Sequence, residues 1–557
     1  MGFEFIPTGF PPASKSVLLS RYDLTGGALK SQETNRRHSN RTSYYVVGEG
    51  IIDEPPYLLG GCPHASPQPM ATAKEKPPLS PFKFGRMFRK AAELPEPQQK
   101  EMIEALKDLG WAMNAESHQK EDSNIPSGYT YLGQFIAHEI TFDKSENVME
   151  PNPDNWRSPH IDLDSLYGDG PEDPASAKVF EADLVKLKIG PTTENASLKR
   201  RFWNDLPRQS SKEAILIDPR NDENLATAQT HVAFIAFHNK VVDLLRGSCP
   251  DGELFKLARR EVVRHFQWII LKDYLPRIVD EEVLDCVIQH QPRWFTVEKD
   301  EDLFMPLEFS AAAFRMGHSM VRDRYEWNDY HSSARSGGAP QVCQLFDHTR
   351  FSSNLGAKPT LDSDWVIDWR RFYNFTEFDY DRPEPGGNFA RKIDPSFDLH
   401  LDRIQGYPHH ELTGKDRSIT VRNLLRGFAL RLPTGEQVAE YMGLTPLSPA
   451  DIAGGPHQKC LDVPLLKGKT PLWYYILKEA ELMGKDGRLG PTGSRIIAET
   501  FVCIIKHSSY SIFDAPEWRP LRSRRKAQSF SPRFEMADLL DIAGVVDPIN
   551  TAHHNPA

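Results

Sequence analysis

The sequence predicts a mainly α-helical fold, in which one large domain holds helices joined by long connecting loops. Apolar residues recur at the three-to-four-residue spacing of buried helices in several segments of the chain. No segment stands out as a β-strand, and no repeat with a period of roughly 20 to 50 residues is visible. An α-class fold is therefore favoured over a sandwich or a solenoid.

Four segments show the helical spacing most clearly. Within residues 253–275, apolar side chains fall on one face of a helix, which indicates that this helix is buried within a bundle. These side chains are Phe255, Ala258, Val262, Phe266, Ile269 and Ile270. We expect the four helices at residues 226–245, 253–275, 307–320 and 494–505.

The composition of the chain changes along its length. Residues 1–81 are rich in proline and polar residues, which predicts an extended N-terminal arm. The domain itself is expected over residues 82–557. Within it, residues 325–417 are rich in Asp, Gly, Pro and aromatic residues and have little periodicity, which predicts long loops with short helices.

Charge and cysteine content exclude several function classes. The chain of 557 residues carries 67 basic and 77 acidic residues, a net charge of −10, so it lacks the basic surface that a nucleic acid requires. Its six cysteines are too far apart for a zinc site and are expected to be free thiols. No apolar run reaches the ~18 residues of a membrane span. No signal peptide is visible, which predicts a cytoplasmic protein by default, with non-classical export as the alternative.

Three segments combine a helical context with residues suited to chemistry. Residues 133–140 (GQFIAHEI) place His138 in an apolar helix, where a histidine is also common as a satisfied core residue. Residues 218–224 (DPRNDEN) precede a long predicted helix, and acidic residues are also ordinary at a helix N-terminus. Residues 308–319 (EFSAAAFRMGHS) place His318 after a glycine, in a segment whose small residues also suit a tightly packed helix end.

Together these segments resemble the animal-type heme peroxidases of the peroxidase–cyclooxygenase superfamily. In that family a Gly-Gln-x-x-x-His helix, an Arg-x-x-Glu segment and an Arg-x-Gly-His helix surround the heme, in the same order along the chain. Residues 421–427 (VRNLLRG) are similar to the Leu-Asn-x-x-Arg-Gly element that follows the family's proximal histidine. The resemblance spans about residues 82–545. It implies the family's helical fold, heme b as cofactor, and hydrogen peroxide and a small reductant as substrates.

The resemblance assigns three residues to the distal side of the heme. His138 would accept a proton from peroxide and return it to the departing oxygen, which neutral imidazole does well near pH 7. Arg220 would stabilise negative charge on the polarised O–O bond, because a guanidinium keeps its charge at working pH. Gln134, one helical turn before His138, would donate to the distal water or to peroxide.

On the proximal side, His318 matches the axial ligand of the heme iron. The amide oxygen of Asn423 would accept the Nδ1 proton of this histidine and so fix its tautomer. Arg315 would pair with a heme propionate, although an arginine at a helix end is also common at a surface. The resemblance thus implies two protein faces, one on each side of the heme.

The segment SPHIDLDSLYG resembles the family's calcium loop, and alternating oxygen ligands suit a hard cation. The family usually has aspartate where this chain has glutamate, beside the distal histidine. The alternative is an Asp-rich turn that binds no metal. The implied calcium ligands are the side chains of Ser158, Asp162, Asp164 and Glu139 and the carbonyl oxygen of His160.

The mammalian members of the family hold their heme by two ester bonds. One uses an aspartate just before the distal histidine, and the other uses a glutamate three residues after the distal arginine. In this chain the first position is Ala137, which has no carboxylate, and the second is Glu223. The resemblance therefore implies at most one ester bond, through Glu223, with a free carboxylate near the heme edge as the alternative.

The same scaffold carries peroxidases, cyclooxygenases and fatty-acid dioxygenases, so the fold alone does not decide the reaction. Lipid-oxidising members place a radical-forming tyrosine three residues before the proximal histidine. This chain has Arg315 there, and Tyr325 does not occupy that position. We therefore expect a peroxidase that cleaves hydrogen peroxide through a ferryl intermediate and oxidises a halide, thiocyanate or a phenolic donor. The alternatives are a heme-dependent fatty-acid dioxygenase and a heme-free helical scaffold protein.

Overall fold

The computed structural model of the chain describes residues 44–46, 50–52, 82–114, 121–143, 149–349, 358–397, 414–523 and 533–550. Most of the predicted N-terminal arm, residues 1–81, lies outside the described residues. Its two described strands, β1 (Tyr44–Val46) and β2 (Gly50–Ile52), pair antiparallel.

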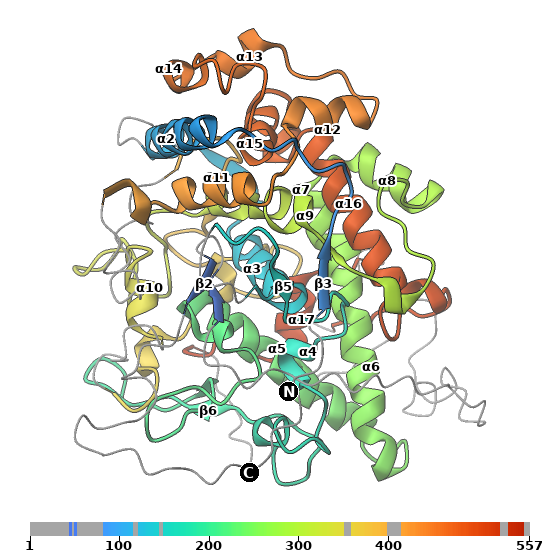
Figure 1. The fold of residues 1–557 in the computed structure, drawn as a ribbon. Coiled ribbons are helices and arrows are strands. Elements are labelled where there is room, and N and C mark those ends of the chain that lie inside the picture. Colours follow the sequence, from blue (N-terminus) through green and yellow to red (C-terminus); the bar gives the residue numbers. More distant parts are fainter. Residues whose placement is uncertain are drawn as a thin grey trace, which may run out of the picture.

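A group of packed helices forms the centre of the domain (Figure 1). Nearly all of α5 is buried, including the polar side chains of Gln229, His231 and His238. α5 packs against α3, α6 and α17, and α16 packs against α8. Their bounds are α3 (Gly128–Ile140), α5 (Leu225–Leu245), α6 (Asp251–Ile269), α8 (Glu281–His290), α16 (Pro491–Lys506) and α17 (Met536–Ala543).

A second group of helices lies at the top of the view in Figure 1. There α2 (Glu96–Met113) packs along α11 (Ile419–Ala429), the helix that carries Asn423. The two backbones approach closely at Gly110, where an added Cβ would lie 2.7 Å from backbone atoms of Val421. The other helices of this group are α12 (Gly435–Tyr441), α13 (Pro449–Ala453), α14 (Gln458–Leu461) and α15 (Leu472–Met483).

The described strands are short and form small sheets. β3 (Phe82–Gly85) pairs antiparallel with β5 (Asp154–Asn155) and parallel with β8 (Met305–Pro306), with Phe82 opposite Asn155 and Phe84 opposite Met305. Two further antiparallel pairs are β4 (Asp122–Pro126) with β9 (Phe389–Arg391) and β6 (Gly190–Pro191) with β7 (Trp203–Asp205). The prediction of a mainly α fold is therefore confirmed.

Short helices connect these elements. Besides α14, the described α-helices of four residues are α4 (Asp164–Tyr167), α7 (Leu275–Ile278), α9 (Leu307–Ser310) and α10 (Gln344–Asp347). The 3-10 helices important for the site are η3 (Pro219–Asp222) and η6 (Ala313–Met320). Further 3-10 helices among the described residues are η2 (Ala177–Val179), η5 (Asp300–Asp302), η9 (Ser363–Trp365), η10 (Trp369–Arg371), η12 (Gly414–Arg417), η13 (Lys485–Gly487) and η14 (Ile512–Asp514).

Two of the four predicted helices are confirmed, and two are interrupted. The helices expected at 226–245 and 494–505 are α5 and α16. The one expected at 253–275 stops being α-helical at Ile269 and continues as a π-helical segment, η4 (Ile270–Tyr274), and then as α7. Pro276 explains the change, because proline lacks an N–H and its ring clashes with the carbonyl of the preceding turn of an α-helix.

The prediction of one continuous helix at 307–320 is wrong. The backbone of Ala312, with φ −134° and ψ −77°, leaves the helical region and separates α9 from η6. The 3-10 form of η6 has three residues per turn, so side chains three positions apart project in the same direction. This spacing determines where the side chains of Arg315 and His318 point.

The expectations for loops and cysteines agree with the described structure. Within 325–417, the described residues contain only short helices and the short strand β9. The five described cysteines are free thiols, and Cys62 lies outside the described residues. Among the residues that the structure covers, no helix is both long enough and apolar enough to cross a membrane.

Candidate functional site

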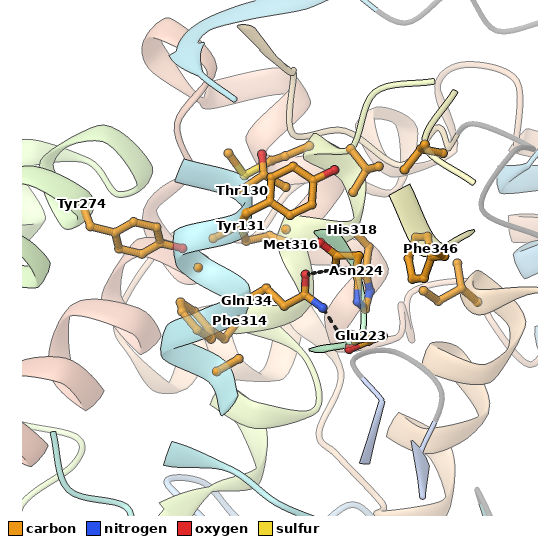
Figure 2. Close-up of a pocket in the computed structure, with 17 residues that line it drawn as sticks. Thr130, Tyr131, Gln134, Glu223, Asn224, Tyr274, Phe314, Met316, His318 and Phe346 are labelled. Atoms are coloured by element: carbon orange, nitrogen blue, oxygen red, sulfur yellow. Dashed lines mark hydrogen bonds between the residues drawn. The ribbon is translucent and has the colours of Figure 1, made fainter. Parts of the chain in front are cut away.

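A pocket lies between α3, which carries the predicted distal residues, and η6, which carries His318 (Figure 2). The space between its walls is about 810 Å³, its open mouth included. Gln134 and His318 both line it, together with Glu223 and Asn224 just before α5. The wall is otherwise mainly apolar, and its larger side chains are Tyr131, Tyr274, Phe314, Met316, Met320, Val321, Val342, Phe346 and Ile419.

The register of α3 decides which of its residues reach the pocket. Thr130, Gln134 and Ala137 are four and three residues apart, so they share one face of the helix and line the pocket. His138 follows one residue later and is completely buried beside that face, not on the pocket wall. Glu139 comes next, about 100° further around the helix, and its carboxylate joins a separate acidic cluster.

Asn221 sets the protonation of His138. The amide oxygen of Asn221 lies 2.9 Å from His138 Nδ1, and its amide nitrogen lies 3.0 Å from His231 Nδ1. An amide oxygen only accepts hydrogen bonds, so His138 carries its proton on Nδ1 and a lone pair on Nε2. Among the described residues, this Nε2 has no hydrogen-bond partner. Burial, and then the charge of Arg220, lower the pKa of His138 to about 3, so the imidazole is neutral at pH 7 and can accept a proton.

Glu223 lies against both the pocket and His138. Its Oε2 is 3.6 Å from His138 Nε2 and accepts a 3.0 Å hydrogen bond from Gln134 Nε2 (Figure 2). Gln134 Oε1 in turn accepts hydrogen bonds from Asn224 Nδ2 and Thr227 Oγ1, each 2.9 Å long. These bonds hold the side chains of Gln134 and Glu223 on the pocket wall.

The structure does not bring the Arg220 guanidinium to the pocket wall, where it was expected to face peroxide. Arg220 is buried, and its Nε and Nη2 donate to the two carboxylate oxygens of Asp218 at 2.9 and 2.7 Å. Nη2 also donates to the carbonyl oxygen of His138 at 2.7 Å, and the guanidinium lies over the ring of Phe142. The reason for this placement is the carboxylate two residues earlier, which matches the two-pronged donor geometry of arginine.

The side chains of Arg315 and His318 both meet Asn423, because η6 projects residues three apart in the same direction. Arg315 Nη1 donates to Asn423 Oδ1 at 2.8 Å, and Asn423 Nδ2 lies 3.0 Å from His318 Nδ1. The expected contact of His318 with the amide oxygen is therefore reversed. A guanidinium has only donors, so it takes the amide oxygen and leaves the amide nitrogen facing the histidine.

Arg315 does not line the pocket but lies behind His318, where it also donates to the carbonyl oxygen of Ser310 at 3.0 Å. Burial, and then the nearby charge of Arg426, lower the pKa of Arg315 to about 9. An anion close to this side chain would therefore be stabilised.

The three carboxylates of the predicted calcium site come together. Glu139, Asp162 and Asp164 are buried, and each offers an oxygen within 4.8 Å of the others. The Glu139 carboxylate also accepts hydrogen bonds from the backbone N–H groups of Asp162, Asp164 and Ser165. Burial, and then the charges of Asp164 and Asp162, raise the pKa of Glu139 well above its ordinary value.

The other two predicted calcium ligands lie in the same loop. Ser158 Oγ is 2.8 Å from the ring nitrogen Nδ1 of His160 and accepts a hydrogen bond from the backbone N–H of that residue. Both residues are buried. The loop therefore keeps its polar side chains inside the protein, where polar groups need partners.

Sequence reasoning missed the residues that connect these features. Asp218 receives hydrogen bonds from both Arg220 and Arg157, and Arg157 Nη1 also lies 3.7 Å from Asp164 in the acidic cluster. Burial opposes ionisation of Asp218, but the charges of Arg220 and Arg157 hold its pKa far below the ordinary value. The available signal was the Asp-Pro-Arg sequence, since the Asp218 carboxylate caps η3 by accepting from the Arg220 N–H.

Buried neutral histidines predict a loss of stability in acid. Burial lowers the pKa of His138 and His231 to about 3 and that of His238 to about 4, whereas an unfolded chain has a histidine pKa near ~6.5. The pKa of each of these histidines is lower in the folded protein than in the unfolded chain. Their protonation therefore leaves the free energy of unfolding unchanged above pH ~6.5 and lowers it progressively as the pH falls toward ~3. At pH 5 each group should remove up to about 2 kcal/mol from the free energy of unfolding.

Thermal unfolding followed by circular dichroism at pH 7.5 and pH 5 measures this effect. The melting temperature should be clearly lower at pH 5, and His231→Gln should reduce the difference between the two values. Equal melting temperatures at both pH values would contradict the neutral, buried state of these histidines.

Comparison with known proteins bears on the identity of this site. Residues 150–363 match the family model described as animal haem peroxidase. This segment is therefore similar in sequence to the animal haem peroxidases. It contains Asp162, Asp164, Arg220, Glu223 and His318. Helix α3, with Glu139, and Asn423 lie outside the matched residues. The recognition made from the motifs is therefore confirmed.

Curated relatives of this chain include a peroxidase-like protein from Margaritifera margaritifera. It is 24% identical over 309 residues, which cover 51% of this chain and 36% of that protein. The chorion peroxidase of Drosophila melanogaster is 25% identical over 182 residues, covering 31% of this chain and 22% of that protein. The chain thus spans about a third or less of the length of these relatives.

Solved structures share the fold of this chain. Peroxidase A from Dictyostelium discoideum matches with a TM-score of 0.55 and 15% identity, over 85% of this chain and 95% of that one. A fatty acid alpha-dioxygenase from Oryza sativa matches with a TM-score of 0.52 and 11% identity, over 78% and 76% of the two chains. At these identities the likeness concerns the fold alone.

Proposed function

We propose that this chain is a heme peroxidase, which reduces hydrogen peroxide and oxidises a halide, thiocyanate or a phenolic donor. The observation that carries the proposal is the pair of histidines at one pocket within a peroxidase domain. His318 lines one wall, and His138 lies behind the opposite wall with the lone pair of Nε2 available. Its low pKa keeps that imidazole neutral at pH 7, which suits a proton acceptor.

The bound heme would supply the iron at which the O–O bond is cleaved. His138 would take the proton of peroxide on Nε2 and return it to the leaving oxygen. Glu223 would move away from His138 as peroxide approaches, and Gln134 would donate from the pocket wall. Arg220 would act from behind α3, by holding the carbonyl oxygen of His138 and keeping its ring neutral.

His318 would hold the iron through Nε2, which requires its proton to be on Nδ1. The Asn423 amide would then turn so that its oxygen accepts that proton, and Arg315 would exchange the amide oxygen for another acceptor. A heme propionate fits this need, because the lowered pKa of Arg315 indicates that a buried anion would stabilise its charge.

Glu223 is proposed as the single residue that bonds covalently to the heme. Its carboxylate is on the pocket wall, and Ala137, at the family's other ester position, lines the same pocket without a carboxylate. Extraction with acidified solvent before and after brief exposure to hydrogen peroxide tests this bond by mass spectrometry. Heme that stays attached in Glu223→Gln, or two separate bonds, would exclude the assignment.

Heme binding is the first expected result. Protein supplied with heme should develop the Soret band typical of histidine-ligated ferric heme and should consume hydrogen peroxide in the presence of iodide, bromide, thiocyanate or guaiacol. If no Soret band appeared, the scaffold alternative would be favoured.

The fatty-acid dioxygenase alternative has support from the shared fold of the Oryza sativa enzyme. Oxygen uptake with linoleate measures this activity directly. We expect none, because Arg315 occupies the position of the radical-forming tyrosine of lipid-oxidising members. Uptake of oxygen with linoleate would reverse the preference for a peroxidase.

Calcium is proposed at the cluster of Glu139, Asp162 and Asp164, with Ser158 and the His160 carbonyl as further ligands. The support is three buried carboxylates within reach of one cation, a set of oxygen ligands that suits calcium. Metal analysis after dialysis without chelator should find about one calcium per chain. Glu139→Gln should lower this content, and wild-type protein without calcium would exclude the site.

A further inference from the structure

A row of aromatic side chains leads away from the pocket toward the surface. Tyr131 lines the pocket from α3, one turn before Gln134 (Figure 2). Its ring centre lies 5.7 Å from that of Tyr325. Tyr325 is completely buried and does not line the pocket. The row of rings therefore extends from the pocket wall into the protein interior.

The row continues through two more contacts. The Tyr325 ring stacks on Phe372, with ring centres 5.8 Å apart, and the edge of Phe372 meets Trp327 at 5.3 Å. Trp327 is buried, and its indole Nε1 donates a 2.8 Å hydrogen bond to the carbonyl oxygen of Trp365. Trp365 is partly exposed. The row therefore ends at the surface.

Two histidines enclose the indole of Trp365. Its ring stacks on His331 at 4.0 Å and on His348 at 3.7 Å. Acidic residues precede these rings in the sequence, with Asp362 and Asp364 before Trp365 and Asp347 before His348. Asp364 Oδ2 lies 3.6 Å from His331 Nε2. Of these carboxylates Asp347 is exposed and Asp362 is partly exposed with Lys358 nearby, whereas Asp364 is buried. The exposed carboxylates at the end of the row would attract a cationic partner.

We propose that these five residues, Tyr131, Tyr325, Phe372, Trp327 and Trp365, form an aromatic relay that carries single electrons from a cationic, macromolecular one-electron donor at the surface to the heme. The inference rests on the proposed peroxidase function. Tyrosine and tryptophan are the side chains that lose one electron most readily. Ring contacts join Tyr131 to Trp327, and the hydrogen bond from the Trp327 indole to the Trp365 carbonyl forms the last link. A donor too large for the pocket would be oxidised at Trp365.

Reduction of one hydrogen peroxide to two water molecules takes two electrons, one from each of two donor molecules, and two protons from solvent. In each transfer Tyr131 gives one electron to the peroxide-oxidised heme and its phenolic proton to water in the pocket. Tyr131 then takes its proton back from the same water and its electron from the donor, and this electron crosses Trp365, Trp327, Phe372 and Tyr325 while all four keep their protons. The Trp327 indole keeps its N–H bonded to Trp365 throughout.

The phenols start in the reduced, neutral form that this sequence of steps needs. Burial, and then Tyr325, raise the pKa of Tyr131 well above its ordinary value. Burial also raises the pKa of Tyr325. Both groups are therefore protonated at neutral pH, and oxidation of Tyr131 releases a proton as well as an electron.

Electron paramagnetic resonance tests the first step. The heme-loaded chain is mixed with one equivalent of hydrogen peroxide without a donor and frozen rapidly. A tyrosyl radical signal is expected that narrows when ring-deuterated tyrosine is incorporated and disappears in Tyr131→Phe. Tyr274→Phe is the matched control, because Tyr274 lines the same pocket but contacts Phe314 and not the relay, and it should keep the signal. An unchanged signal in Tyr131→Phe would overturn the relay.

Turnover with ferrocytochrome c, a cationic macromolecular donor, tests the remaining steps. Tyr325→Phe and Trp327→Phe should lose most cytochrome c oxidation and keep iodide oxidation, because iodide enters the pocket directly. Trp369→Phe is the control, since Trp369 also contacts Phe372, at 6.1 Å, but lies off the path to Trp365. Full cytochrome c oxidation in both relay variants, or none in wild type, would overturn the proposal. Absence of any reaction between heme and peroxide would instead refute the peroxidase function itself.

Discussion

Replacing His318 with alanine is expected to abolish heme retention, because His318 is the histidine on the pocket wall opposite α3 and the proposed axial ligand. Replacing His138 with alanine is expected to keep the heme and to slow its reaction with hydrogen peroxide by about 10²- to 10⁴-fold, the usual contribution of a proton-transfer group. Heme titration and stopped-flow mixing with peroxide measure the two effects separately.

His238→Gln is the matched control for both substitutions. His238 is also completely buried, with a pKa lowered to about 4, but it bonds to Tyr167 and the Val185 carbonyl and does not line the pocket. This variant should behave as wild type in both measurements. Full heme retention in His318→Ala would exclude it as the ligand, and an unchanged peroxide reaction in His138→Ala would exclude that residue as the proton acceptor.

Replacing Asp218 with alanine is expected to cost about 3–5 kcal/mol of the free energy of unfolding, the usual effect of removing one partner from a buried ion pair. Asp218 is completely buried and accepts hydrogen bonds from the two buried arginines Arg157 and Arg220. Without the carboxylate, both guanidinium groups lose a partner in a place that water does not reach. Urea unfolding of the heme-free protein measures the loss.

Asp243→Ala provides the comparison for Asp218. Asp243 pairs with Lys186 at 2.7 Å, but about half of its side chain is exposed, 49%. An exposed pair contributes at most about 1 kcal/mol, so this variant should stay close to wild type. If the two substitutions cost the same, Asp218 would not be the centre of the buried network.

The helices of the central group were predictable because their apolar spacing is a local property of the sequence. α5 and α16 begin and end within three residues of their expected bounds. The break at Ala312 was not predictable in this way. The small residues around it are compatible with a helix, and the packing of η6 between α3, α9, α15 and α16 selects the broken form.

The motifs predicted which residues belong to the site but not how their side chains are oriented. Gln134, Glu223 and His318 do line one pocket, although they come from distant parts of the chain. Arg220 and Arg315 carry the right charge in the right motif, yet Asp218 and Asn423 hold them off the pocket wall. Arginine side chains are long, so the nearest acceptors in the folded chain decide where their donors point.

By itself, then, the sequence determined the helical class, the family motifs and their order, and the identity of the candidate ligands, because these depend on residue type and spacing along the chain. Only the tertiary structure decided the pairing of Asp218 with two arginines, the orientation of the Asn423 amide and the contact between Tyr131 and Tyr325. Each of these contacts joins segments that are remote in sequence or depends on competition among several partners. In a buried site this competition decides the structure, because a polar group removed from water must form its hydrogen bonds within the protein.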